Sequence, residues 1–111
     1  MKLQEMTASI KPAFRRIAEK LLNSEDFESL KDFGDGFEAF IGVEGGVLLP
    51  EVVLNPDGEV LKFECQCRGS RNHKICVHIE AVLLGIEKML QAGCDDYHEA
   101  VMKLAHETGD K

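Results

Sequence analysis

The chain has 111 residues, a formal net charge of −7 and an apolar content of 44%, values that describe one folded domain rather than a disordered segment. No apolar run reaches the ~18 residues that span a bilayer, and the first residues lack the apolar centre of a signal peptide. We therefore expect a single cytoplasmic domain, residues 1–111, that enters no membrane and is poorly suited to binding polyanions without sequence preference.

The negative charge is concentrated in one part of the chain. Residues 25–59 hold ten acidic residues against Lys31 alone, a local balance of −9, so the remaining residues are slightly basic at +2. A surface with this charge would select a basic partner.

Residues 8–22 are predicted to form an amphipathic helix. Ser9 can act as the N-cap, and Pro12 falls in the first turn, where its missing N–H costs nothing. Apolar side chains recur at helical spacing, at Ile10, Phe14, Ile17 and Leu21. The polar face carries the basic residues Lys11, Arg15, Arg16 and Lys20. This basic face is either simply solvated or a strip that binds phosphates or an acidic partner.

Residues 23–33 allow two interpretations. Phe27, Leu30 and Phe33 have the spacing of a short second helix, but the same residues could lie in a loop. Two glycines that follow, at positions 34 and 36, end the segment in either case.

From Phe37 the apolar period changes to two, which is typical of β-strands. The pattern predicts strands at 37–43, 47–54 and 59–66, joined by turns at Gly45-Gly46 and at Asn-Pro-Asp-Gly. A proline within the second strand, at position 50, cannot donate to a ladder and therefore indicates an edge strand or a bulge. The strands predict a small antiparallel β-meander, and with the flanking helices an α+β fold.

The most informative motif runs from Cys65 to His78 with the spacing Cys-x-Cys-x8-Cys-x-His. Alternate residues of a strand point the same way, so Cys65 and Cys67 share one face where the third strand ends. After a polar loop, apolar residues at helical spacing predict a helix at Val77–Gln91. Residues two apart lie about 200° apart on a helix, so Cys76 is expected at or before the helix start and His78 in its first turn.

Three thiols and an imidazole form the closed ligand set of structural zinc, and we expect one zinc ion bound by Cys65, Cys67, Cys76 and His78. Four protein ligands leave no open position for a catalytic water, which predicts a protein that is not an enzyme and has no small-molecule substrate. Three alternatives stay open: buried thiols beside a core histidine, His73 in place of His78, and a redox role for the Cys-x-Cys pair.

The residues after this motif predict one more helix and a tail. Gly93 ends the preceding helix, and Asp95 or Asp96 caps a last helix at 97–106. A second metal ion could instead be held by Cys94, Asp95, Asp96 and His98, although capping and burial are the more ordinary roles of these residue types.

The segment from strand to helix, FECQCRGSRNHKICVHIEAVLL, resembles the SWIM-type zinc finger family, whose pattern is Cys-x-Cys, a variable loop, and Cys-x-His leading into an apolar helix. The resemblance covers about 30 to 50 residues and leaves the N-terminal helix and the C-terminal tail unexplained. It implies a ββα zinc fold, a role in binding DNA or proteins, and the ligands Cys65, Cys67, Cys76 and His78. The domain then divides into a helical part at 1–33, a SWIM-like zinc-binding core at 37–92, and a C-terminal helix and tail at 93–111.

Two functions fit the sequence. A protein-interaction module or adaptor would present the zinc-bound hairpin and helix as a rigid surface, with the acidic segment selecting its partner. A nucleic-acid-binding module would be nucleoid-associated or nuclear, and would use the basic residues Lys62, Arg68, Arg71 and Lys74, joined by Arg15 and Arg16. Residues 62–80 have a net charge of only +2, and the loop has no aromatic side chain to stack on a base, so we expect a protein partner.

Overall fold

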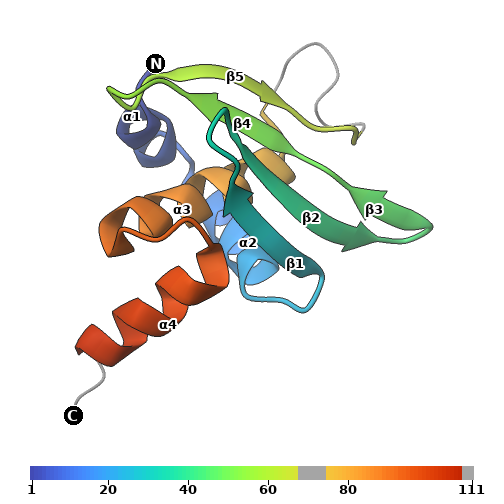
Figure 1. Ribbon diagram of the computed structural model, residues 1–111. Coiled ribbons are helices and arrows are strands. Elements are labelled where there is room, and N and C mark those ends of the chain that lie inside the picture. The colour runs from blue at the N-terminus through green and yellow to red at the C-terminus, as the bar shows by residue number, and fades with distance from the viewer. Residues whose placement is uncertain (68–74, 109–111) are drawn as a thin grey trace.

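A single antiparallel sheet lies on a layer of helices, which confirms the predicted α+β fold (Figure 1). The computed structural model describes residues 1–67 and 75–108. The helices of this part are α1 Leu3–Ala8, α2 Pro12–Leu22, α3 Val77–Ala92 and α4 Tyr97–Thr108. The strands are β1 Phe27–Asp32, β2 Phe37–Val43, β3 Gly46–Leu48, β4 Glu51–Leu54 and β5 Val60–Glu64.

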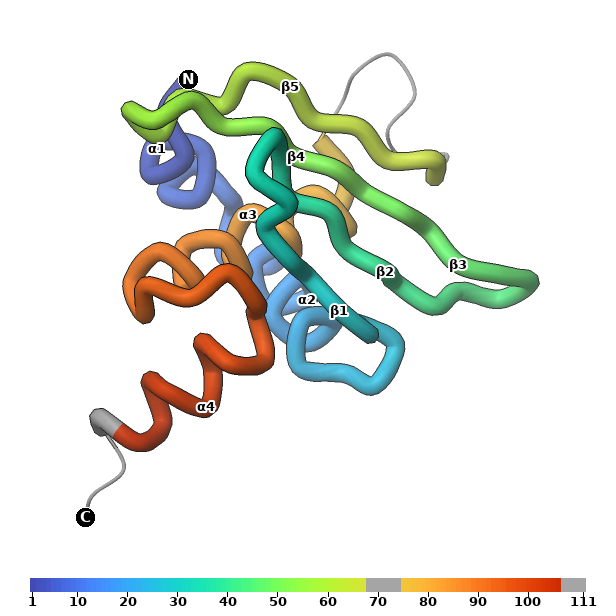
Figure 2. The backbone as a smooth tube through the Cα atoms, viewed as in Figure 1, coloured from blue at the N-terminus to red at the C-terminus, as the bar shows by residue number. Residues whose placement is uncertain are grey.

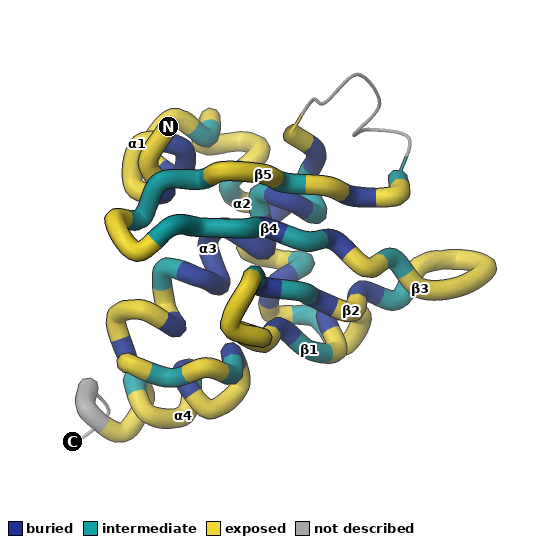
Figure 3. Tube along the Cα trace, turned by 45° about the horizontal axis from the view of Figure 1, so that its top comes forward, coloured by how far each residue is buried: buried dark blue, intermediate teal, exposed yellow. Residues whose placement is uncertain are grey.

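The helix α3 is the centre of the core. It packs against α1, α2 and α4 and also against β2 and β4 of the sheet, and Figure 2 shows it passing beneath the sheet. Side chains from all around it are buried, as expected for a helix enclosed by other elements; the fully buried ones are Ile79, Val82, Leu83, Ile86 and Met89. The inner face of the sheet closes the core with Phe27, Leu30, Ala39, Ile41 and Val52. Burial is therefore greatest where sheet and helices meet, and the turn from β2 to β3 is exposed (Figure 3).

The predicted meander is confirmed, but the interpretation of Pro50 as a mark of an edge strand or a bulge is wrong, since the register against β2 is the same before and after it. The strands pair in the order β1-β2-β4-β5, and β3 pairs with β2 ahead of β4, so the interrupted strand lies inside the sheet. Pro50 separates β3 from β4 because it has no N–H to donate, while its carbonyl still accepts from the amide of Ala39 at 3.0 Å. The proline thus breaks the strand and leaves the sheet continuous.

Residues 27–32 form the strand β1, so both earlier interpretations of this segment, a short helix or a loop, are wrong. A bulge between Phe27 and Ser29 shifts the register against β2. The extra residue lets Phe27 and Leu30 both point into the core, three positions apart, which imitates the spacing of a helix. The part at 1–33, predicted to be helical, therefore ends in a strand.

The helix predicted at 8–22 begins only at Pro12, as α2, so the prediction of Ser9 as its N-cap is wrong: the N-cap is Lys11, and a separate helix, α1, precedes it at Leu3–Ala8. Ser9 ends α1, where its hydroxyl donates to Met6 O at 2.8 Å, and α2 begins at Pro12. The helix α2 is buried through Ala18 and Leu22. Two of the apolar residues expected to face the core, Phe14 and Ile17, instead expose 51% and 54% of their surface.

The predicted end of α3 at Gly93 and the predicted aspartate cap of the last helix are confirmed, although that helix runs to Thr108 rather than 106. Gly93 follows α3 in the left-handed conformation with φ of 71°, which a residue without a β-carbon adopts at no steric cost. Asp96 Oδ1 accepts hydrogen bonds from the backbone amides of His98 and Glu99, at 2.9 and 3.2 Å, and so caps α4. Among the helices of the described residues, none combines the length and apolar character needed to cross a membrane.

Candidate metal centre

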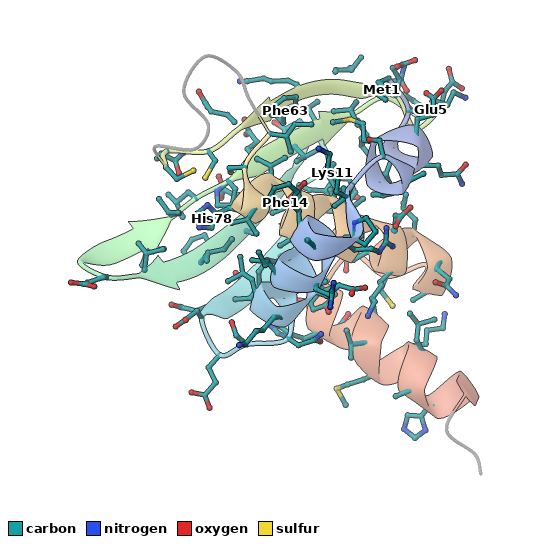
Figure 4. All side chains as sticks on the ribbon, turned by 180° about the vertical axis from the view of Figure 1, so that it is seen from behind. Met1, Glu5, Lys11, Phe14, Phe63 and His78 are labelled. Carbon is teal, nitrogen blue, oxygen red and sulfur yellow. The ribbon has the colours of Figure 1, made fainter. Side chains whose placement is uncertain are left out.

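Four side chains that carry metal-ligand atoms meet where β5 leads toward α3. Cys65 and Cys67 follow the last residue of β5, Cys76 is the N-cap of α3, and His78 lies in the first turn of that helix. Their ligand atoms all lie within 4.8 Å of one another, and Cys76 Sγ lies 3.7 Å from His78 Nδ1. Figure 4 shows the imidazole of His78 at the start of α3, beside the end of β5. The cluster could hold one metal ion, and the predicted positions of Cys76 and His78 are confirmed.

The spacing of these atoms fits zinc. Tetrahedral bonds of about 2.3 Å to sulfur and about 2.0 Å to nitrogen place two sulfurs about 3.8 Å apart, and a sulfur and a nitrogen about 3.5 Å apart. The 3.7 Å between Cys76 Sγ and His78 Nδ1 is close to the second value. Because all the ligand atoms lie within 4.8 Å of one another, the other pairs would need to move only a short way together to bind one zinc ion. All four cysteines of the chain lie in the described residues, and none forms a disulfide.

Local backbone geometry explains why these residues converge. Strand alternation places Cys65 on the same side as Phe63, which is paired with the buried Val52 and so faces inward. Cys76 is extended, with φ of −100° and ψ of 173°, while its carbonyl already accepts from the amide of Glu80 at 3.0 Å. An N-cap in this conformation holds its side chain beside the helix end, where the helix dipole favours a thiolate.

The closely spaced thiols of the cluster favour the binding of a cation. Burial raises the pKa of the Cys65 thiol to about 12; a hydrogen bond from the backbone of Cys67 opposes this, and the nearby Cys76 and Cys67 thiols add to it. Several thiolates cannot share so small and dry a space without compensation. A divalent ion supplies that compensation and lets the thiols ionise as it binds.

The basic residues proposed for nucleic acid are not brought onto one face, as far as the structure describes them. Lys62 lies on the outer face of the sheet, where its Nζ is 3.5 Å from Glu51 Oε1. Arg15 and Arg16 belong to α2, on the helix side, and Arg15 donates to the carbonyl of Thr7 at 3.1 Å. The loop candidates Arg68, Arg71, Lys74 and His73 lie outside the described residues.

The residues considered for a second metal ion make contacts unrelated to metal binding. Asp96 caps α4, His98 Nε2 lies 3.0 Å from the carbonyl oxygen of Glu28, and Cys94 Sγ lies 3.8 Å from that of Ala92. Across residues 1–67 and 75–108, the group around Cys65 is the one set of metal-ligand side chains close enough to share an ion.

Sequence reasoning missed a row of acidic residues on the outer face of the sheet. Glu38 of β2 pairs directly with Glu51 of β4, and Glu51 pairs directly with Glu64 of β5. Glu38 and Glu51 had been counted in the acidic excess of residues 25–59, and Glu64 only in the balance of the basic segment 62–80. Only the register of the strands, which the alternation of a single strand cannot give, shows that they lie side by side.

Comparison of this chain with family models, with characterised proteins and with solved structures finds no match.

Proposed function

We propose that this protein is a zinc-stabilised, SWIM-type module that binds another protein and catalyses no reaction. The closed set of three thiols and one imidazole supports a structural metal, because four protein ligands leave no coordination position for substrate or water. A strand before the Cys-x-Cys pair and a helix after the Cys-x-His pair support the SWIM assignment.

The glutamate row carries the proposal of a protein partner. Directly opposed residues on neighbouring strands have β-carbons about 4.5–5.5 Å apart, and like charges in that position are destabilising. Lys62 compensates Glu51 and Lys31 of β1 is directly opposed to Glu38, but within the described residues Glu38 and Glu64 form no ion pair. A partner that places positive charge beside the row would relieve this repulsion and so bind favourably.

Two exposed apolar side chains lie on the same face as the row. Phe40 alternates with the inward-facing Ala39 and Ile41, and it exposes 42% of its surface. Val47 pairs with Gly42, so it lies on the same side, and it exposes 52%. In the described part of the chain no helix covers this face (Figure 1). Exposed apolar groups flanked by charge are typical of protein interfaces.

The same observations disfavour nucleic acid. An acidic sheet face repels phosphates, and the described basic residues of α2 lie on the helix side, away from Lys62. Zinc has a part in the interface as well, because Glu64 directly precedes the ligand Cys65. The metal therefore holds the end of β5, and with it one end of the acidic row, against α3.

A pull-down with matched variants tests the proposal. Zinc-loaded wild type should retain a specific protein from its source cell, Glu38→Lys/Phe40→Ala should lose it, and Glu99→Lys/Met102→Ala should keep it. The control makes the same charge change and removes an apolar side chain on α4, where Met102 exposes 66% of its surface. Retention by the sheet-face variant would contradict the proposal.

A second measurement addresses the nucleic-acid alternative. A labelled oligonucleotide should give no shift at micromolar protein and low salt. A shift that weakens with added salt and disappears in Arg68→Ala/Arg71→Ala would replace the protein partner with a nucleic acid.

A further inference from the structure

The helix α2 has an exposed apolar stripe that nothing in the described chain covers. Its buried side packs on α3, where Leu22 Cδ1 lies only 3.3 Å from the position that a β-carbon on Gly85 would take. Phe14 and Ile17, three positions apart on the helix, point elsewhere and expose more than half of their surface. Figure 4 shows Phe14 on α2, which here lies in front of α3.

Positive charge borders this stripe. Arg15 is compensated by Glu19, with 3.7 Å between Nε and Oε2. The exposed cations of α2 that form no ion pair within the described residues are Lys11, Arg16 and Lys20. In a chain of net charge −7, this helix is therefore a basic and apolar surface.

The helix stripe and the outer sheet face complement each other in charge and in apolar character. One has Phe14 and Ile17 beside unpaired cations. The other has Phe40 next to Glu38 on the outer face of β2, Val47 farther along toward the β2–β3 turn, and Glu64 at the end of β5. Their sizes also agree: an 11-residue helix is roughly 16 Å long, and the four strands from β1 to β5 span roughly 14 Å.

We propose that α2 of one copy of this chain docks on the outer sheet face of a second copy. The inference rests on the proposed function, since it identifies the basic partner of the acidic sheet face as the chain itself. The two surfaces lie on opposite sides of the molecule (Figure 1), so one copy cannot join its own. Pairing of α2 with α2 would bring like charges together, so it is disfavoured. The remaining arrangement is head-to-tail, with α2 of each copy on the sheet face of the next.

A head-to-tail contact leaves each assembly with one unused helix and one unused sheet face. Association therefore continues until a ring closes or the protein concentration limits it. The contact is small and charged, so its strength should depend on both protein concentration and salt.

Sedimentation velocity of the zinc-loaded protein tests the inference. From about 1 µM to about 1 mM, the average mass of the wild type should rise with concentration and fall with added salt. Phe14→Ala/Ile17→Ala and Glu38→Lys/Phe40→Ala should each stay monomeric, since each lacks one of the two faces. Both variants change exposed or outward-facing residues, and wild-type zinc content will verify their folds.

Mixing the two variants is the decisive step. Each then supplies the face that the other lacks, so the mixture should form a heterodimer that grows no further. The control Glu99→Lys/Met102→Ala should associate as the wild type does. A mixture that stays monomeric overturns the inference.

The outcomes separate the inference from the proposed function. A wild type that is monomeric at all concentrations, but retains a foreign protein through Phe40 and Glu38, overturns the self-association alone. Association that survives in the sheet-face variant but not in the helix variant indicates α2 pairing and also overturns it. A protein that neither associates with itself nor retains a partner contradicts both the inference and the proposed function.

Discussion

Zinc and protons should compete for the cluster, and a change of pH is the perturbation that measures this competition. Zinc binds thiolates, whereas the metal-free cluster holds thiols, so each cysteine ligand gives up its proton when the ion enters. The pKa of Cys65, raised to about 12 by burial and its neighbours, keeps that thiol protonated at every pH of practical interest.

The size of the effect follows from the number of thiols. Cys65 alone lowers the apparent zinc affinity about tenfold for each pH unit of acidification. All three cysteines together lower it by up to about 1000-fold per unit. Competition with a chromophoric chelator across a pH series measures this slope, and Cys94→Ser, whose thiol lies outside the cluster, should give the wild-type slope.

Stability should respond to pH with opposite signs in the two forms. A raised pKa in the folded state stabilises the metal-free protein below the thiol pKa of the unfolded chain, about 8.5. That stability is lost as the pH rises toward 12, the folded pKa of Cys65. The zinc-loaded protein instead gains stability with pH, because its binding releases protons. A zinc affinity that changes less than about tenfold per pH unit, or the same trend in both forms, would refute this reasoning.

Three further changes test the site and the core. Cys76→Ser should lose zinc and destabilise the C-terminal half of the fold, whereas Cys94→Ser should keep about one zinc per chain by metal analysis. Gly85→Ala should lower the free energy of unfolding by about 1–3 kcal/mol, because the new β-carbon would lie 2.6 Å from a leucine side chain of β1; Gly46→Ala, with open space around it, should change it little in urea titrations. Asp96→Ala should cost about 0.5–2 kcal/mol by thermal unfolding, because two backbone amides of α4 lose their acceptor.

The geometry of the candidate metal site could be predicted closely because its constraints are local. Side chains two residues apart lie on the same face of a strand but on nearly opposite faces of a helix. This rule alone places Cys65 and Cys67 together and shows that Cys76 and His78 cannot both lie within the helix and bind the same ion. The structure has all four at the expected positions. Caps and turns were predictable for the same reason, since Gly93 and Asp96 act on backbone groups only a few residues away.

The errors arose where distant residues decide the structure. A bulge opposite β2 gave Phe27 and Leu30 a helical spacing within a strand. In α2 the sequence pattern favoured a core of Phe14 and Ile17, but contact with α3 buries Ala18 instead, and small residues allow close approach of two helices. Amphipathic spacing therefore predicted a helix correctly without predicting which side of it is covered.

A metal ion bound by the cluster would complement the first residues of the chain at the edge of the sheet. Among the described strands β5 pairs with β4 alone, and such an edge needs other support. At its beginning, backbone bonds supply it, because Leu3 N donates to Gly58 O and Val60 N donates to Met1 O, both at 2.9 Å. At its end the ladder stops, and Cys65 places a ligand there instead. A zinc ion bound there would fix the end of β5, where pairing with β4 stops at Glu64, and this is also the end that carries Glu64 into the acidic row.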